Sequence, residues 1–243
     1  MAPPRALLRA APRPLSRNDP CRNGRKPHPP KRSSLNFKNG LLAPAQKRIL
    51  LMHILETQRL ILRPPSHSDE LLLHGLHSDP FVVNAVMKGV YPTLEQSKAE
   101  LLHLINHWQR NPFGLWIVFV KDEGQARKFA GYCGLRCIDP DLPADPNNVE
   151  FVTRLHLAAS GKGIGVEAGR VVVKFAFEHL KLDKVNSFIL PNNTRSILMC
   201  VKIGFFYLGD VIYNNVLMKY FVISPGTLVE EDGLHVWNTN NDT

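Results

Sequence analysis

A glycine-rich segment, Ser160 to Gly165, holds the residue types best suited to bind an anion. Its glycines, Gly161, Gly163 and Gly165, stand at every second position. They permit positive φ angles and let a ligand approach the backbone. The segment precedes a run with helical periodicity, and the first turn of a helix presents unpaired backbone N–H groups. We therefore expect a diphosphate to bind here. Lys162 either adds a charge-assisted contact or is an ordinary solvated lysine.

The same glycines also fit a rival pattern, the dinucleotide-binding fingerprint. Gly163, Gly165 and Ala168 have its spacing, and Asp183 lies about 20 residues beyond Gly163, as that fingerprint requires. However, Asp183 precedes the next predicted strand instead of ending it, and too little chain follows to build further parallel units. The sequence also has no phosphate loop of the Gly-x-x-x-x-Gly-Lys-Ser/Thr kind. This context disfavours a dinucleotide-binding fold.

The histidines and cysteines form no metal-binding pattern. His103 and His107 have the i, i+4 spacing of two helical ligands, but no glutamate follows His103 and no third ligand is evident, so we expect ordinary solvated histidines. No Cys-x-x-Cys pair is present, which excludes a zinc ribbon and a dithiol redox motif. The sequence therefore predicts no metal cofactor and reduced, mostly buried thiols at four positions, Cys21, Cys133, Cys137 and Cys200.

The elements that flank the glycine segment are the most clearly patterned in the chain. From Val149 to Leu157 residues alternate in type, with Glu150 and Arg154 on the same predicted face, which indicates a strand. Residues 163–180 carry a polar stripe at helical spacing and apolar residues on the other faces, which indicates a helix. The glycine segment thus connects a strand to a helix.

Turn and capping residues define the remaining elements. Thr93 and Gln96 have the spacing of a capping box at the start of a helix that Asn111 ends, and Gly204 is placed to close another helix in a left-handed conformation. A first helix is expected to start near Ser66 or Ser68, and a last one covers 193–203. The other predicted strands cover 60–62, 115–121, 128–138, 185–190, 205–209 and 216–222.

This order of elements predicts one α/β domain of the α+β type. Its sheet is expected to be mixed, mostly antiparallel and twisted, with about six to seven strands and about four helices. Runs 115–121 and 128–138 should pair as a hairpin, because a turn-forming cluster separates them. We place the domain at 52–223, between a tail at 1–51 and a loose C-terminal tail at 224–243.

The N-terminal tail accounts for the basic character of the chain. Residues 1–51 hold twelve Lys or Arg against one acid, Asp19, whereas the whole chain has a net charge of +9. Proline interrupts the tail repeatedly, and we expect it to be disordered. It is either a segment outside the native protein, an organellar transit segment or a basic arm for nucleic acid or membrane. The rest of the chain is slightly acidic, which makes nucleic acid an unlikely partner.

No run of residues is long and apolar enough to span a bilayer, and no charged-then-apolar signal peptide opens the chain. We therefore expect a cytoplasmic protein without a membrane partner, with organellar import possible if the tail is genuine.

Four ordered motifs resemble the GNAT superfamily of N-acetyltransferases, and within it the branch of ribosomal-protein N-terminal acetyltransferases. Residues 55–64 are similar to the opening strand of that branch and residues 130–136 to its third strand. Residues 149–168 align without a gap with its acetyl-CoA segment, and 193–205 resemble its closing signature. The resemblance covers about 54–222 and implies a GNAT fold.

The resemblance implies that acetyl-CoA binds as co-substrate where the sheet splays between strands 149–157 and 185–190. Pantetheine would meet the backbone of Leu155 to Leu157, and the diphosphate would lie on Gly161 to Val166. The implied cofactor-binding residues are Leu155, His156, Leu157, Ser160, Gly161, Lys162, Gly163, Ile164, Gly165, Val166, Asn193 and Ser196. The chain departs from the family in having Ser160 in place of glutamine or arginine, and Cys200 where many members have a tyrosine.

The resemblance also implies direct attack of a neutral amine on the thioester, with a backbone N–H near Leu157 stabilising the oxyanion. Glu150 is the candidate base, although it could equally be a salt-bridged glutamate opposite Arg154. Ser196 either protonates the thiolate or only caps a helix, and Asn193 lines the same end of the site. The expected partner is an amine, either a protein N-terminus or a small molecule, and the chain is expected to be a monomer or homodimer.

Two further functions stay open on sequence alone. One is a catalytically degenerate module that binds acyl-CoA without transfer. The other is a nucleic-acid binder that uses the basic tail, and only the tail supports it.

Overall fold

The computed structural model describes residues 53–86, 89–121, 127–138 and 149–227. The predictions made for 1–51 and for 228–243 lie outside these residues. Within them, no helix has both the length and the apolar character needed to cross a membrane.

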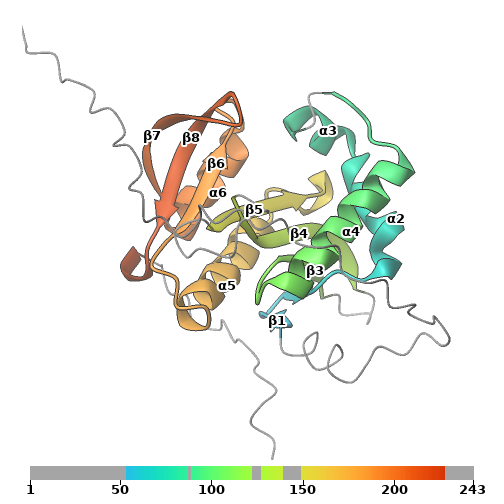
Figure 1. Ribbon diagram of the computed structural model, residues 1–243, viewed down its shortest axis with the longest axis horizontal. Helices are drawn as coiled ribbons and strands as arrows, with labels where there is room; N and C mark the ends of the chain where they lie inside the picture. Colours follow the sequence, from blue (N-terminus) through green and yellow to red (C-terminus); the bar gives the residue numbers. More distant parts are fainter. Residues whose placement is uncertain (1–52, 87–88, 122–126, 139–148, 228–243) are drawn as a thin grey trace, which may run out of the picture. The chain divides into compact units, whose positions relative to one another are not determined.

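The described residues form one eight-stranded sheet in the order β1-β2-β3-β4-β5-β6-β8-β7 (Figure 1). Every neighbouring pair is antiparallel except β5 and β6, which are parallel. The mixed, mostly antiparallel sheet and the β3–β4 hairpin confirm the predicted fold class. The strands are β1 (Leu55–Glu56), β2 (Leu60–Arg63), β3 (Leu115–Val120), β4 (Lys128–Cys137), β5 (Val149–Leu155), β6 (Val185–Ile189), β7 (Phe206–Tyr213) and β8 (Val216–Ile223).

Helices cover both faces of the sheet. They are α2 (Glu70–His77), α3 (Pro80–Val86), α4 (Leu94–Arg110), α5 (Ile164–Glu178) and α6 (Thr194–Ile203), with short 3₁₀ turns at His67–Asp69, Leu157–Ala159 and Pro225–Thr227. In β3, Trp116 and Val118 belong to the core that α5 helps to form, whereas Leu115 and Ile117 belong to the core beneath α2 and α4. This alternation is the period of two expected of a strand that is buried on both faces.

The predicted helix ends are confirmed where side chains or glycine specify them. Thr93 and Gln96 form the capping box of α4: Gln96 N–H donates to Thr93 Oγ1 at 3.2 Å, and Thr93 N–H donates to Gln96 Oε1 at 2.8 Å. Gly204 ends α6 with φ 118°, in the left-handed region.

Three elements differ from the predictions. The segment after Ser66 forms two α-helices, α2 and α3, and not one, because Asp79-Pro80 starts a second helix with proline in its first turn. A short strand, β1, precedes the predicted opening strand. Strand β7 continues past Gly209 to Tyr213, because that glycine, at φ 143°, adjoins a shift in register instead of ending the strand.

Candidate functional site

Strands β5 and β6 part shortly after they meet. Their ladder holds a single register pair, Glu150 opposite Asn186. The Asn186 amide group adds one more link, because Nδ2 donates to Val149 O at 2.9 Å. Toward the carboxyl end of both strands no further pair joins them, so one side of β5 has no partner strand within the described part of the chain.

The pairing of β5 with β4 decides which backbone groups face this gap. The His156 N–H donates to Ala130 O at 2.9 Å, on the β4 side. Because backbone groups point to opposite sides at successive residues, the N–H and C=O groups of Thr153 and Leu155 point toward β6. An amide-bearing ligand can satisfy such groups by adding itself as a strand.

The glycine segment lies at the end of this gap, at the start of α5. Gly161 and Gly163 have φ angles of 75° and 78°, in the left-handed region where residues with a side chain are strained. A Cβ added at Gly165 would lie 2.7 Å from Met199 Sδ of α6, so this glycine lets the two helices approach closely. The glycines of this segment therefore present backbone, and not side chains, to the space in front of α5.

Arg59, just before β2, braces this segment. Its Nε donates to Glu167 Oε2 at 2.6 Å, and one of its terminal nitrogens donates to the Lys162 carbonyl at 3.0 Å. The Thr57 hydroxyl donates to the other carboxylate oxygen of Glu167. These contacts fix the first turn of α5 and the loop before it to the opening strands of the domain. Arg59 was not among the predicted site residues, although it lies within the first motif of the resemblance.

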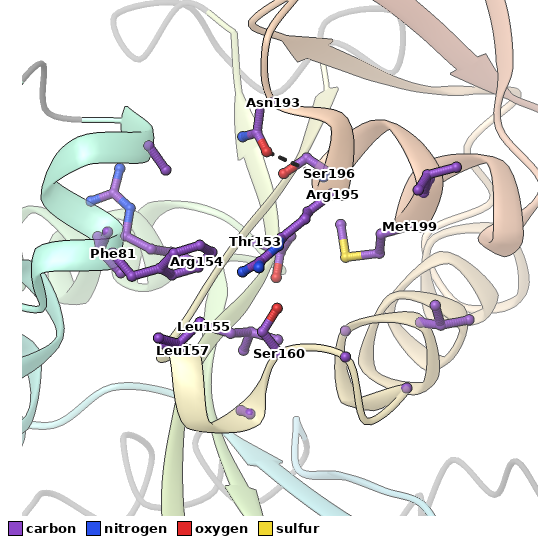
Figure 2. A pocket seen from close by; sticks show the side chains of 18 of the residues that line it. Phe81, Thr153, Arg154, Leu155, Leu157, Ser160, Asn193, Arg195, Ser196 and Met199 are labelled. Carbon is purple, nitrogen blue, oxygen red and sulfur yellow. Dashed lines mark hydrogen bonds between the residues drawn. The ribbon is translucent and has the colours of Figure 1, made fainter.

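A cavity of about 390 Å³ occupies the space between β5, the glycine segment and α6 (Figure 2). Nine of the predicted cofactor-binding residues line it: Leu155, Leu157, Ser160, Gly161, Gly163, Gly165, Val166, Asn193 and Ser196. Three do not. Ile164 is buried in the core beneath α5, the Lys162 carbonyl accepts from Arg59, and the His156 ring lies beside Asp79.

The charged side chains that line this cavity are all cationic: Arg154, Arg195 and Lys202. Arg195 extends from α6 across the cavity and places its guanidinium 4.7 Å from the centre of the Phe81 ring, on α3 (Figure 2). A cavity with three cations and no carboxylate on its described walls favours a polyanionic ligand. The sequence did not predict that Arg195 and Lys202 line this cavity, because the spacing of a motif does not reveal which long side chains reach a cavity.

Asn193 and Ser196 lie at the junction between this cavity and a second one. Asn193 Oδ1 accepts the Ser196 N–H at 3.2 Å, so the asparagine caps α6 (Figure 2). Both residues line both cavities. The predicted cap at the start of α6 is therefore provided by Asn193, and Ser196 stands one turn further along.

The second cavity, of about 490 Å³, lies toward α4 and holds Glu150 on its wall. Glu150 is buried, and its ion-pair partner is Arg136, directly opposite on β4, whose Nε donates to Oε2 at 2.9 Å. The Tyr213 hydroxyl donates to the same oxygen at 3.4 Å. The ion-pair partner considered from sequence, Arg154, instead lies over the Tyr132 ring, 5.4 Å from its centre.

Burial raises the pKa of Glu150 above its ordinary value, and the neighbouring Arg136 guanidinium opposes this shift. Within this site the desolvation of the carboxylate outweighs the attraction of the cation. A carboxylate with a raised pKa takes up a proton more readily, which suits a general base.

Asp79 holds the carboxyl end of β5. Its Oδ2 accepts the Leu157 N–H at 3.3 Å and lies 2.9 Å from His156 Nδ1. Burial would raise the pKa of Asp79, but the hydrogen bond from His156 holds it below the ordinary value. The backbone N–H near Leu157 that was expected to stabilise an oxyanion is thus directed at Asp79 in this structure.

Cys200 stands where the resemblance places a tyrosine in many relatives. Its thiol is buried, lies 3.8 Å from Ser187 Oγ and lines the second cavity. Burial raises the pKa of this thiol to about 12. The thiol therefore stays protonated at neutral pH.

The histidines at i, i+4 on α4 are not both solvated as expected. His107 is half-buried and its Nε2 accepts the Cys137 N–H at 3.4 Å, whereas His103 is exposed. Among the residues described by the structure, no group of three or more histidines, cysteines and acids could hold a metal ion.

Comparison with known proteins agrees with this geometry. Residues 59–206 match the family model of the acetyltransferase (GNAT) domain. An uncharacterized protein of Bacillus subtilis (strain 168), YkkB, is 29% identical over 161 residues, which are 63% of this chain and 85% of that protein. The N-acetyltransferase p20 of Bacillus licheniformis, also uncharacterized, is 27% identical over 158 residues, covering 63% of this chain and 83% of its own.

Solved structures share the fold. A GNAT-family acetyltransferase from Bacillus anthracis superposes with a TM-score of 0.58 at 20% identity, covering 70% of this chain and 98% of that one. Aminoglycoside acetyltransferase AAC(6')-Ib in complex with coenzyme A superposes with a TM-score of 0.57 at 20% identity, over 69% of this chain and 96% of its own. Because the family model spans more than half of the sequence, the chain belongs to the GNAT acetyltransferase family and is an acetyl-CoA-dependent acyltransferase.

Proposed function

We propose that this enzyme moves the acetyl group of acetyl-CoA to a primary amine by direct attack of the amine on the thioester. The observation that carries the proposal is the gap between β5 and β6, which continues into a cationic cavity with a glycine-lined helix start at its end. This combination offers strand-like pairing to an amide-bearing arm and backbone N–H groups to a diphosphate. The acceptor is either a protein N-terminus or a small molecule.

We assign the phosphate end of the ligand to the glycine segment and the cations around it. Gly161, Gly163, Gly165 and Val166 line the cavity at the N-terminus of α5, where the helix dipole favours negative charge. Arg195 and Lys202 add full charges from α6. The backbone groups of Thr153 and Leu155 are our candidates for pairing with the pantetheine amides, in place of the pairing at His156 and Leu157 expected from sequence.

The chemistry is assigned to the junction of the two cavities. Glu150 accepts a proton from the amine, directly or through a water molecule, on the side of the second cavity. Ser196 is the candidate donor of a proton to the departing thiolate, and Asn193 orients the same end of the ligand. Bringing both reactants to this junction replaces an encounter in solution with a reaction within one site.

Similarity to the ribosomal-protein N-terminal acetyltransferases supports a peptide amine as acceptor, whereas the fold shared with AAC(6')-Ib, which is known in complex with kanamycin, supports a small-molecule amine. We place the catalytic domain at 52–223, with the tails at 1–51 and 224–243 outside it, and expect it to act in the cytoplasm as a monomer or homodimer.

A second function, an acyl-CoA-binding module without transfer, is favoured by the thiol of Cys200 at the position of the usual tyrosine. Calorimetry with acetyl-CoA, followed by an assay of thiol release over a panel of amines and peptides, separates the two. Binding of acetyl-CoA together with thiol release supports the enzyme. Binding of acetyl-CoA without thiol release in the presence of any amine supports the module. Repeating the calorimetry on residues 52–243 tests the basic tail: affinity for acetyl-CoA should be unchanged.

A further inference from the structure

The outer wall of the second cavity is a stack of aromatic rings. Phe188 of β6 lies parallel to Tyr213 of β7, with centroids 4.3 Å apart and planes at 3°. Tyr220 of β8 also stacks on Phe188, with ring centroids 5.1 Å apart and planes at 11°. Phe188 and Tyr213 both line the cavity. Strands β6 and β7 thus present two aligned rings to the space in which the acceptor would bind, and Tyr220 of β8 supports Phe188 without lining the cavity.

Hydrogen bonds fix this stack in place. The Tyr220 hydroxyl donates to Asn186 Oδ1 at 2.8 Å, and the Tyr213 hydroxyl donates to Glu150 Oε2 at 3.4 Å. The rings are therefore ordered before a ligand binds. Binding of a planar ligand against them costs little side-chain conformational entropy of the protein. The second hydrogen bond also places the candidate base at the end of the Tyr213 ring.

The charges on the described walls of this cavity balance. Glu150 is paired with Arg136 at 2.9 Å, and the charge of the remaining acid, Glu100, is matched by that of Arg154. An acceptor with several ammonium groups needs an excess of carboxylates around it, since each unpaired cation loses hydration on entry. These walls provide no such excess. The described walls therefore disfavour an acceptor with several ammonium groups.

We propose that the acceptor of this enzyme is an arylalkylamine: a single primary amine one or two carbons from an aromatic ring. The ring packs against the edge of Phe188, whose faces are covered by Tyr213 and Tyr220, and against Tyr213. The short linker brings the amine to Glu150, next to the junction with the first cavity. This inference rests on the proposed function, because it assigns the substrate class of the same site. A small arylalkylamine and a peptide that begins with phenylalanine share this chemistry.

The test compares acceptors that differ in one property each. Thiol release from acetyl-CoA is measured with 2-phenylethylamine, n-butylamine, kanamycin and peptides beginning with Phe or Ser. We expect kcat/KM for 2-phenylethylamine to exceed that for n-butylamine and kanamycin by about tenfold or more, since edge-to-face ring contact and ring burial are available only to the aromatic amine. Preference for kanamycin or equal rates with butylamine overturns the inference. The two peptides decide whether the arylalkyl group is taken from a free amine or a chain terminus.

Two variants localise the effect. Phe188→Leu should reduce kcat/KM for 2-phenylethylamine about tenfold while changing that for n-butylamine less than about twofold. Tyr213→Phe keeps the ring, and its preference for the aromatic amine should persist. The matched control is Tyr207→Leu, which removes a ring of β7 that lines neither cavity. If Phe188→Leu lowers kcat/KM for 2-phenylethylamine and for n-butylamine by the same factor, the aromatic rings do not select the acceptor.

A binding measurement separates this inference from the proposed function. Calorimetry of 2-phenylethylamine with the protein saturated with coenzyme A reports the second cavity without any turnover. Absence of thiol release with every amine overturns the proposed function alone, if the aromatic amine still binds and Phe188→Leu weakens it about tenfold. Absence of binding by the aromatic amine, while other amines are acetylated, overturns the inference alone. Acetyl-CoA affinity, unchanged in Phe188→Leu, shows that this variant is folded.

Discussion

Replacing Glu150 by glutamine removes the candidate base while leaving the site assembled. The glutamine side chain has the same shape, and its carbonyl oxygen can still accept the hydrogen bond that Arg136 donates at 2.9 Å to the carboxylate. We therefore expect the stability at neutral pH to stay within about 1 kcal/mol of the parent, since the weaker hydrogen bond to Arg136 is offset by removing a buried charge whose pKa burial raises. The variant should fold and bind acetyl-CoA.

The activity should fall much further than the stability. General-base catalysis typically contributes a factor of roughly 10² to 10⁴, which corresponds to about 2.7–5.4 kcal/mol in the activation free energy. We expect kcat to fall by about 10²-fold or more for Glu150→Gln, while the matched control Glu178→Gln, on the far part of α5, stays within about twofold of the parent. The assay is thiol release at saturating acetyl-CoA.

The pH dependence gives a sharper readout than the rate alone. Burial raises the pKa of Glu150 above its ordinary value of 4.5, so the base is lost as pH falls through this raised pKa. The parent enzyme should show an acidic limb in kcat/KM above pH 4.5, and Glu150→Gln should lack it. A glutamine variant with nearly full activity and an unchanged acidic limb refutes the assignment of Glu150 as base.

The raised pKa of Glu150 affects stability in the direction opposite to its effect on activity: stability is higher at low pH, whereas activity is higher at high pH. Because the folded pKa exceeds the unfolded one, the folded state holds the proton in the pH range between them, and ionisation of Glu150 costs stability as pH rises through the folded pKa. From low pH to neutral pH, the Tm of the parent should therefore fall relative to that of Glu150→Gln. Thermal melts over this range measure the difference.

Three further predictions follow from the first cavity and the core. Arg195→Ala removes a cation that crosses the cavity and should weaken acetyl-CoA binding about 3- to 30-fold by calorimetry, with Lys174→Ala, a cation of α5 outside both cavities, as the unaffected control. Gly163→Val forces a β-branched residue to φ 78° and should lower stability by about 1–3 kcal/mol in chemical denaturation and weaken acetyl-CoA binding. The Cys200 thiol, whose pKa burial raises to about 12, should resist alkylation at pH 8 in the native protein and react on unfolding; rapid native labelling of this residue by mass spectrometry would contradict its burial.

Sequence reasoning succeeded where one residue determines its own local structure. Thr93 and Gln96 specify the start of α4 through bonds within one turn, and Gly204 specifies the end of α6 through its own φ angle. It was less reliable where a residue type occurs in two kinds of local structure, as glycine does at the end of a strand and at a register shift within one. Gly209 was interpreted as the end of a strand, but the ladder with β8 extends past it to Tyr213.

The candidate site divides in the same way. The glycine segment was predicted from local sequence, since its alternating glycines need no distant partner to show their conformational purpose. The partner of Glu150 was not, because the register between β4 and β5 decides that Arg136 stands opposite it. Arg195 and Phe81 meet across the cavity from helices far apart in sequence, and no spacing rule relates such positions.

The single ladder pair between β5 and β6 has a mechanical consequence. It divides the sheet into a five-stranded part and a three-stranded part that are joined by few backbone hydrogen bonds, so local opening should begin along this line before either part unfolds. A bound pantetheine arm that pairs with both strands would hold the two parts of the sheet together. Hydrogen–deuterium exchange at β6 should consequently slow when coenzyme A is added, while the amides of β3, in the middle of the larger part, should exchange at the same slow rate with or without it.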